Sequence, residues 1–241
     1  MPELLAKVCK CQSFNYLSFT MKKNIIITII ILAVLGLGFM LYKVSPQPLP
    51  SVVVDFNLSG IGQVAAPSGM LSDDHVLGNP EAKNTIVAYE DLQCPACANY
   101  EPILKSFAKE LNDTKVIFRH FPLMSIHKNA SLAALASESA SVQGKFWEYS
   151  DQLYTNQSEW QALSNPIEQF TVYAQQVGVP DMEKFKKELV EQTYKSRVER
   201  DLREALGLGV NATPTLYFNG SKIEVDGLES VKQQVEPLYV K

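Results

Sequence analysis

Two cysteines separated by two residues, in the stretch Cys94-Pro95-Ala96-Cys97, are the side chains best suited to chemistry. The apolar run 85–89 before them is typical of a buried strand, and residues 98–111 after them repeat apolar side chains at helical spacing. Cys94 therefore begins a helix, where unpaired backbone N–H groups and the helix dipole stabilise an anion. Because a thiolate is such an anion, we expect Cys94 to be acidic, nucleophilic and partly exposed, and Cys97 to be more buried.

The spacing of the two cysteines also favours a reversible bond between them. Pro95 suits the first helical turn, where its missing N–H leaves no hydrogen bond unmade. Cys97 follows Cys94 by three residues, which places both on the same helix face within bridging distance. The pair can therefore cycle between a dithiol and a disulfide.

A zinc site is the alternative, because Cys-x-x-Cys also begins many such sites. Two more ligands would be needed, and the remaining histidines and cysteines of the chain are His75, His120, His127, Cys9 and Cys11. The last two lie across a predicted membrane span. A purely structural disulfide is disfavoured, since so short a loop restricts the unfolded chain little. We therefore predict redox chemistry that needs no metal and no cofactor.

Composition and charge exclude some other classes of function. The chain has 241 residues, of which 46% are hydrophobic and 20% charged, so it can form a sizeable core without disulfides. After Lys43, 17 Lys and Arg residues stand against 25 Asp and Glu residues, a net charge of −8. This acidic balance argues against binding to nucleic acid or to anionic lipid.

The N-terminal part predicts a membrane anchor. Residues 25–42 carry no charge over 18 positions, the lower limit for a transmembrane helix. Lysines are denser before this run than after it, which predicts a cytoplasmic segment 1–24 and an extracytoplasmic remainder. A cleaved signal peptide is the alternative, but no small-x-small cleavage pattern follows the run. Met21 would begin a more usual leader, which leaves the true start open.

The rest of the chain divides into a linker and one domain. Residues 43–74 are rich in Pro and Gly and predict an extracytoplasmic linker. Residues 75–241 predict an α/β domain in which a strand, a helix and a parallel strand form a right-handed unit. A helical insertion at about 127–206 follows, and then come a strand, the turn Asn219-Gly220, a returning strand and a last helix.

The motifs from His75 onward together resemble the DsbA-like thiol:disulfide oxidoreductases of the thioredoxin superfamily. Three features match: the redox pair Cys94-Pro95-Ala96-Cys97, the helical insertion at 127–206, and the proline after threonine near the third strand, Thr213-Pro214. Four shorter motifs also match: His75-Val76-Leu77-Gly78, Pro102-Ile103-Leu104, Phe118-Arg119-His120-Phe121-Pro122-Leu123 and Gly144-Lys145-Phe146-Trp147. The resemblance covers about two thirds of the chain and implies a thioredoxin-like fold with an inserted helical subdomain.

The resemblance also implies site residues beyond the cysteines. Pro214 would be cis and lie against the disulfide, with Thr213 offering its extended backbone to a client strand beside Pro95 and Ala96. Without the resemblance, Pro214 would be read as a trans residue opening an edge strand.

One position departs from the family pattern. Relatives often carry a buried acid six residues before the first active-site cysteine, where this chain has Ala88. Glu90 lies two residues further on, on the same face of a regular strand. It could accept the proton of Cys97, or it could be a solvated loop residue; the pattern leaves both open.

The sequence therefore predicts a membrane-anchored protein-disulfide oxidoreductase that acts outside the cytoplasm of a bacterium. Cys94 would be the nucleophile and Cys97 the resolving thiol, and together they would introduce disulfides into client proteins. A membrane partner would reoxidise the pair. The alternatives are a reductase or isomerase on the same fold, and, from another class, a non-catalytic thioredoxin-like binding domain.

Overall fold

A computed structural model of the chain describes residues 24–40, 50–111 and 113–239, and these form two separate units divided after Pro48. In the first unit residues 24–40 are helical and exposed. The end of the predicted span, Leu41 and Tyr42, lies outside the described residues, as do Cys9 and Cys11. Within the described ranges, no helix has both the length and the apolar character that crossing a membrane requires.

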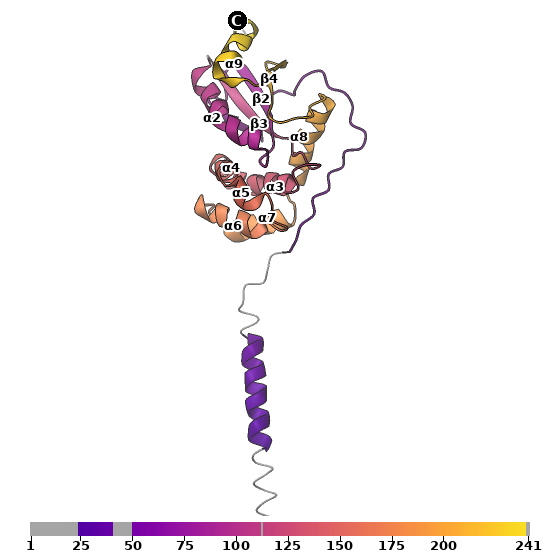
Figure 1. The fold of residues 1–241 in the computed structure, drawn as a ribbon, viewed down its shortest axis with the longest axis vertical. Helices are drawn as coiled ribbons and strands as arrows, with labels where there is room; N and C mark the ends of the chain where they lie inside the picture. The colour runs from indigo at the N-terminus through magenta and orange to yellow at the C-terminus, as the bar shows by residue number, and fades with distance from the viewer. Residues whose placement is uncertain (1–23, 41–49, 112, 240–241) are drawn as a thin grey trace, which may run out of the picture. The chain divides into compact units, whose positions relative to one another are not determined.

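The second unit is built on a mixed sheet of five strands in the order β1-β3-β2-β4-β5 (Figure 1). Only β2 and β3 run parallel; the other neighbouring pairs are antiparallel. The strands are β1 His75–Leu77, β2 Asn84–Glu90, β3 Thr114–His120, β4 Thr215–Phe218 and β5 Ser221–Ile223. The parallel pair and the hairpin were predicted, whereas β1 was not, because three residues are too few to show an alternating pattern.

Helices cover both faces of this sheet and make up the insertion (Figure 1). They are α2 Pro95–Glu110, α3 Ala130–Ser141, α4 Phe146–Thr155, α5 Gln157–Trp160, α6 Ile167–Gln176, α7 Met182–Val190, α8 Lys195–Gly207, α9 Gly227–Val235 and the 3-10 helix η1 Glu236–Leu238. As predicted, one helix joins β2 to β3, a block of helices separates β3 from β4, and a helix follows the hairpin.

Strand β2 shows how the core is divided. Ile86 and Ala88 face one side and pack in a cluster with α2 and α9, while Val87 and Tyr89 face the other side and pack with the inserted helices. Both sides of the strand are buried, which explains why its sequence is apolar without interruption. The redox motif follows directly from the end of this central strand.

Residues 50–74, predicted as linker, lie along helix α8 in the structure, and we call them the strap (Figure 1). The Val64 N–H donates to the Gly207 carbonyl at 2.9 Å, and Arg203 donates to the carbonyl of Asn57 at 2.7 Å. Phe56 is 7% exposed and belongs to the core. The strap has no regular secondary structure, yet its backbone is tied to the domain.

Candidate active site

The two cysteines lie at the N-terminus of α2, as predicted. Cys94 is the N-cap residue and Pro95 the first helical residue, so the N–H that proline lacks costs no helical hydrogen bond. Both cysteines are free thiols. Cys94 is 7% exposed and Cys97 is fully buried, whereas Pro95 and Ala96 between them are exposed. The predicted order of burial is confirmed, although Cys94 is less exposed than we expected.

The two thiols differ sharply in acidity. The pKa of Cys94 is lowered to about 5, chiefly because the Cys97 thiol donates a hydrogen bond to it. The backbone N–H groups of Ala96 and Cys97 lower the pKa further, whereas burial of Cys94 raises it. Burial raises the pKa of Cys97 well above its usual value, and the negative charges of Glu90 and Cys94 raise it further. Cys94 is thus a thiolate at neutral pH and Cys97 a thiol, the pattern expected of a nucleophile and a resolving thiol.

The loop before β4 covers Cys94. The Thr213–Pro214 peptide bond is cis, and the Thr213 carbonyl oxygen lies 3.5 Å from the Cys94 sulfur. Strand β4 pairs antiparallel with β2, with Thr215 opposite Tyr89, and this pairing carries the loop to the active-site end of the sheet. This cover explains why Cys94 is less exposed than we expected. The cis geometry agrees with the prediction; the role of Thr213 and Pro214 in client binding stays a prediction.

Glu90 is the last residue of β2 and is 2% exposed, which contradicts the solvated-loop alternative. Burial raises its pKa to about 8, against smaller opposing effects of the Cys97 thiol and the Tyr154 hydroxyl. The Tyr154 hydroxyl donates to Glu90 Oε2 at 3.2 Å. A carboxyl that titrates near neutral pH beside the resolving thiol can exchange a proton with it.

Two residues outside the predicted site hold the loop before α2. Asp91 accepts the Leu123 N–H at 2.8 Å and faces His127 Nδ1 at 2.7 Å. Gln157 donates to the carbonyls of Leu92 at 2.9 Å and Cys94 at 3.0 Å. Gln157 could not be found from sequence, because it lies 63 residues from Cys94 and in no motif.

The described residues contain one cluster whose donor atoms could hold a metal ion: His75, His120 and Glu138. Both histidine Nε2 atoms lie 2.8 Å from Glu138 Oε1, and an Arg197 nitrogen lies 2.8 Å from Oε2. The guanidinium of Arg197 pairs with the carboxylate and opposes a further cation. The cluster fits a buried hydrogen-bonded group better than a metal site.

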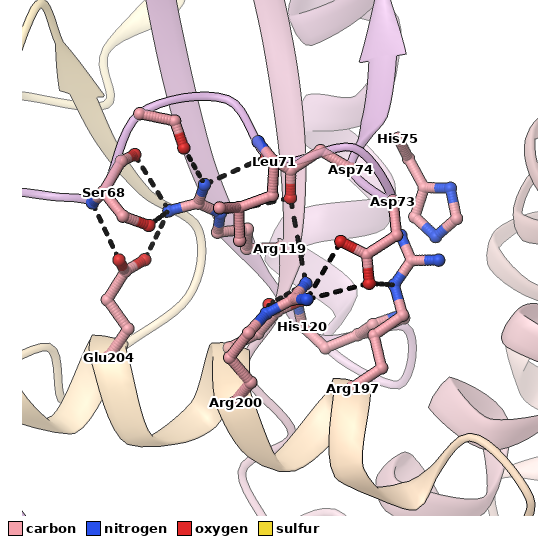
Figure 2. Close-up of polar contacts among 12 residues, drawn as sticks. Ser68, Leu71, Asp73, Asp74, His75, Arg119, His120, Arg197, Arg200 and Glu204 are labelled. Atoms are coloured by element: carbon pink, nitrogen blue, oxygen red, sulfur yellow. Dashed lines mark hydrogen bonds and ion pairs between the residues drawn. The ribbon is translucent and has the colours of Figure 1, made fainter.

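A second buried network joins the strap to β3 and α8 (Figure 2). Arg119 on β3 is 1% exposed and lies between Asp74 at 3.0 Å and Glu204 at 2.5 Å, and it also donates to the Ser68 hydroxyl at 2.9 Å. Tyr89 donates to the same Glu204 carboxylate. At the same end of the strap, Arg200 donates to the carboxylate of Asp73, the residue before Asp74.

A helix-start thiol pair under a cis-proline loop, at the end of a central strand, is the arrangement of thioredoxin-type redox proteins. The chain belongs to the thioredoxin family, because residues 71–237 match the family model described as Thioredoxin.

Comparison with solved structures identifies the group within the thioredoxin superfamily to which the chain is similar. Oxidised BdbD from Bacillus subtilis has a TM-score of 0.63 and 25% identity, with 73% of this chain and 98% of that chain covered. DsbA2 from Pseudomonas aeruginosa has a TM-score of 0.54 and 25% identity, over 71% of this chain and 97% of that chain. These matches confirm a DsbA-like thiol:disulfide oxidoreductase of the thioredoxin superfamily, as the sequence motifs predicted.

Among curated proteins, the Na(+)/H(+) antiporter NhaA 3 of Salinispora tropica is 34% identical over 149 residues. This match covers 62% of the present chain and 22% of the antiporter. The chain spans about a quarter of the length of the antiporter relatives that it matches.

Proposed function

We propose that this protein is a membrane-anchored, extracytoplasmic oxidase that introduces disulfides into client proteins through Cys94 and Cys97. The observation that carries the direction of the reaction is the acidic Cys94 thiol, whose pKa is lowered to about 5. A stabilised thiolate favours the reduced protein, so its disulfide readily takes electrons from a client. The ion exchange in the names of the antiporter relatives is not part of the proposal, because the match covers 22% of the first of them.

The reaction has two thiol–disulfide exchanges. A client thiolate attacks the Cys94 sulfur, the Cys94–Cys97 bond breaks, and the departing Cys97 thiolate takes a proton. A second client thiolate then attacks the client sulfur of the mixed disulfide, and Cys94 departs as a stabilised thiolate. The client loses two electrons, and the protein gains them as a dithiol.

The remaining site residues have supporting roles in this proposal. Glu90 supplies the proton to Cys97 and recovers it when the pair is reoxidised. Thr213 offers its backbone to the client strand beside Pro214, and Pro95 and Ala96 provide the exposed surface next to Cys94. The reaction uses no metal and no cofactor, and a membrane redox partner reoxidises the dithiol.

The reduction potential separates this proposal from a reductase or isomerase. Equilibration of the pair with glutathione buffers, followed by alkylation and mass measurement, would give it directly. We expect a value well above that of thioredoxin, which is about −270 mV, and within the range up to about −120 mV reached by strong oxidants. A potential at or below that of thioredoxin would reverse the assigned direction. A Cys94 thiol that alkylates slowly at mildly acidic pH would instead favour a non-catalytic binding domain.

The proposed location has its own test. The uncharged run 25–42, preceded by four lysines, supports an uncleaved anchor with a cytoplasmic N-terminus. We expect the full-length product to remain in membranes after carbonate washing, and Cys94 to react with an impermeant maleimide applied from outside. Release of a soluble fragment that begins after Lys43 would contradict the anchor, and protection from the maleimide would contradict the orientation.

A further inference from the structure

A cavity of about 380 Å³ lies beside the strap, between the first turn of α3 and the loop that joins α5 to α6. Its apolar wall consists of Val52, Val54, Met124 and Leu132. The volume is within the range of about 300–1,000 Å³ that is typical of ligand pockets. None of the described residues that line it is Asp or Glu, and Lys128 is the one charged side chain among them. The cavity therefore suits an occupant that joins an apolar group to a negative charge.

The first turn of α3 brings unpaired backbone donors to this cavity. Asn129 is the N-cap residue, but its side chain donates to the carbonyls of Trp160 at 3.0 Å and Leu163 at 3.0 Å and does not cap the helix. The N–H groups of Ser131 and Leu132, which both line the cavity, have no hydrogen-bond partner among the described residues. Such N–H groups, together with the positive end of the helix dipole, bind carboxylate and phosphate groups.

The side chain of Ser131 is an independent sign of a ligand at this place. Ser131 lines the cavity and is 7% exposed, and its hydroxyl has no hydrogen-bond partner within the described part of the chain. Buried polar groups are nearly always paired, so an unpaired one calls for a ligand or a chemical role. Lys128 is exposed beside it; its Nζ donates to the Ala162 carbonyl at 2.8 Å and has two further protons to donate. All of these groups are donors, so the partner they fit is an anionic acceptor.

Gln93, the residue before Cys94, joins the cavity to the redox motif. Gln93 Oε1 accepts the Asn129 N–H at 2.8 Å, and Gln93 Nε2 donates to the Gln161 carbonyl at 3.2 Å. Gln93 is buried, so these two hydrogen bonds fix the start of α3 and the loop after α5 next to the redox motif. The cavity is thus within reach of a peptide that is attached to Cys94.

We propose that this cavity binds a client carboxylate, from an Asp or Glu side chain that stands next to an apolar residue near the reacting cysteine. This inference rests on the proposed function, because it makes the cavity a part of the client-binding surface. The carboxylate accepts from the N–H groups of Ser131 and Leu132 and from the Ser131 hydroxyl, with Lys128 beside it. The apolar neighbour packs against Val54 and Met124. Binding here makes and breaks no covalent bond; it selects clients by the charge beside their cysteine.

Oxidation of matched peptides tests the site. Full-length oxidised protein in detergent is given reduced peptides with two cysteines and either Leu-Glu or Leu-Gln, placed at several positions on either side of the first cysteine. Acid quenching and chromatography give kcat and KM. At the best position we expect the KM of the Glu peptide to be about tenfold lower at similar kcat, because hydrogen bonds to a charged group contribute at least that much. Lys128→Gln and Ser131→Ala should each reduce this preference severalfold, and Gly-Glu in place of Leu-Glu should raise KM.

The matched control is Lys186→Gln, which removes a lysine from helix α7 that pairs with Glu183 at 3.2 Å and does not line the cavity. It should keep the full preference for the Glu peptide. Equal KM values for the Glu and Gln peptides in the wild type would overturn the carboxylate site and leave the proposed function standing. Loss of the preference in Lys186→Gln as well would overturn it as an effect of net charge.

Two further measurements separate the site from its alternatives. Free acetyl-leucine is compared with a cysteine-free Leu-Glu peptide as a competitor of oxidation; equal competition would show a site for small carboxylates and overturn the client assignment. Peptides that the oxidised protein leaves reduced would overturn the proposed function. Fluorescence anisotropy of labelled cysteine-free Leu-Glu and Leu-Gln peptides then decides the cavity by itself, since equal binding of the two would overturn the site and tighter binding of Leu-Glu would support it.

Discussion

The Cys94 sulfur lies 3.5 Å from the carbonyl oxygen of Thr213, although 119 residues separate them in the chain. The contact exists because β4 returns beside β2 after the whole helical insertion. It places the backbone of the loop before β4 directly over the nucleophile. The redox motif and the loop before β4 therefore meet because their strands pair in the sheet, and not because they are close in sequence.

Removal of the Cys97 thiol should make Cys94 less acidic. The Cys97 thiol is the largest influence that lowers the pKa of Cys94 to about 5. We expect Cys97→Ala to move the pKa upward towards that of free cysteine, while the helix N–H groups keep it below about 8.5. Ultraviolet absorbance of the thiolate against pH measures this value. An unchanged pKa would mean that the helix terminus alone sets the acidity.

Replacement of the buried acid should stabilise the protein at neutral and alkaline pH. Because burial raises the pKa of Glu90 from 4.5 to about 8, the wild type loses stability as pH rises between these values, when the carboxyl ionises in the unfolded chain first. Glu90→Gln removes that loss. Its free energy of unfolding should match the wild type near pH 4.5 and exceed it by about 2–5 kcal/mol above pH 8.

Urea denaturation of the reduced proteins across this pH range is the measurement. Glu159→Gln is a suitable control, because Glu159 is exposed. If the difference between Glu90→Gln and wild type did not grow with pH, Glu90 would not be a carboxyl of raised pKa in the folded protein.

The local parts of the fold and site could be predicted from sequence because each has a local cause. Cys94 is at a helix start because an apolar strand precedes it and Pro95 can begin the helix. The position of Pro214 against Cys94 came from family resemblance, since no rule of spacing joins residues so far apart. The sequence could not decide whether Glu90 is a buried proton acceptor or a solvated loop residue. Glu90 is the last residue of its strand, and its burial depends on helix α4, which packs over it.

The strap was the least predictable part. Its Pro and Gly content is that of a free linker. Its contacts are isolated backbone hydrogen bonds, contacts with charged side chains of β3 and α8, and a few buried side chains. Arg119 could not have been assigned its partners, since Asp74 and Glu204 lie on opposite sides of it in the chain, 45 and 85 residues away. Such pairings follow from the sheet and α8 meeting in space.

Replacement of Arg119 should destabilise the domain strongly. Arg119→Met would leave Asp74, which is 1% exposed, and Glu204 without their common cation. Removal of one partner of a buried ion pair typically costs about 3–5 kcal/mol, because the other charge stays buried. The control Lys232→Met removes an exposed pair and should cost no more than about 1 kcal/mol. Equal losses in the two variants, measured by urea denaturation, would contradict the role of the network.

A methyl group at Gly207 should loosen the strap without touching the redox pair. A Cβ there would lie 2.6 Å from Val64 Cγ2 and 2.7 Å from the Gly62 carbonyl oxygen, so the strap must move to admit it. We expect Gly207→Ala to lower the free energy of unfolding by about 1–3 kcal/mol, the usual cost of overpacking, and to speed proteolysis between residues 57 and 69.

Gly62→Ala is the matched control, since its Cβ would meet nothing within 4 Å. The Cys94 pKa should be the same in both variants, because no strap residue is among the groups that set it. Unchanged proteolysis in Gly207→Ala would show that the strap is not held by its close approach to α8.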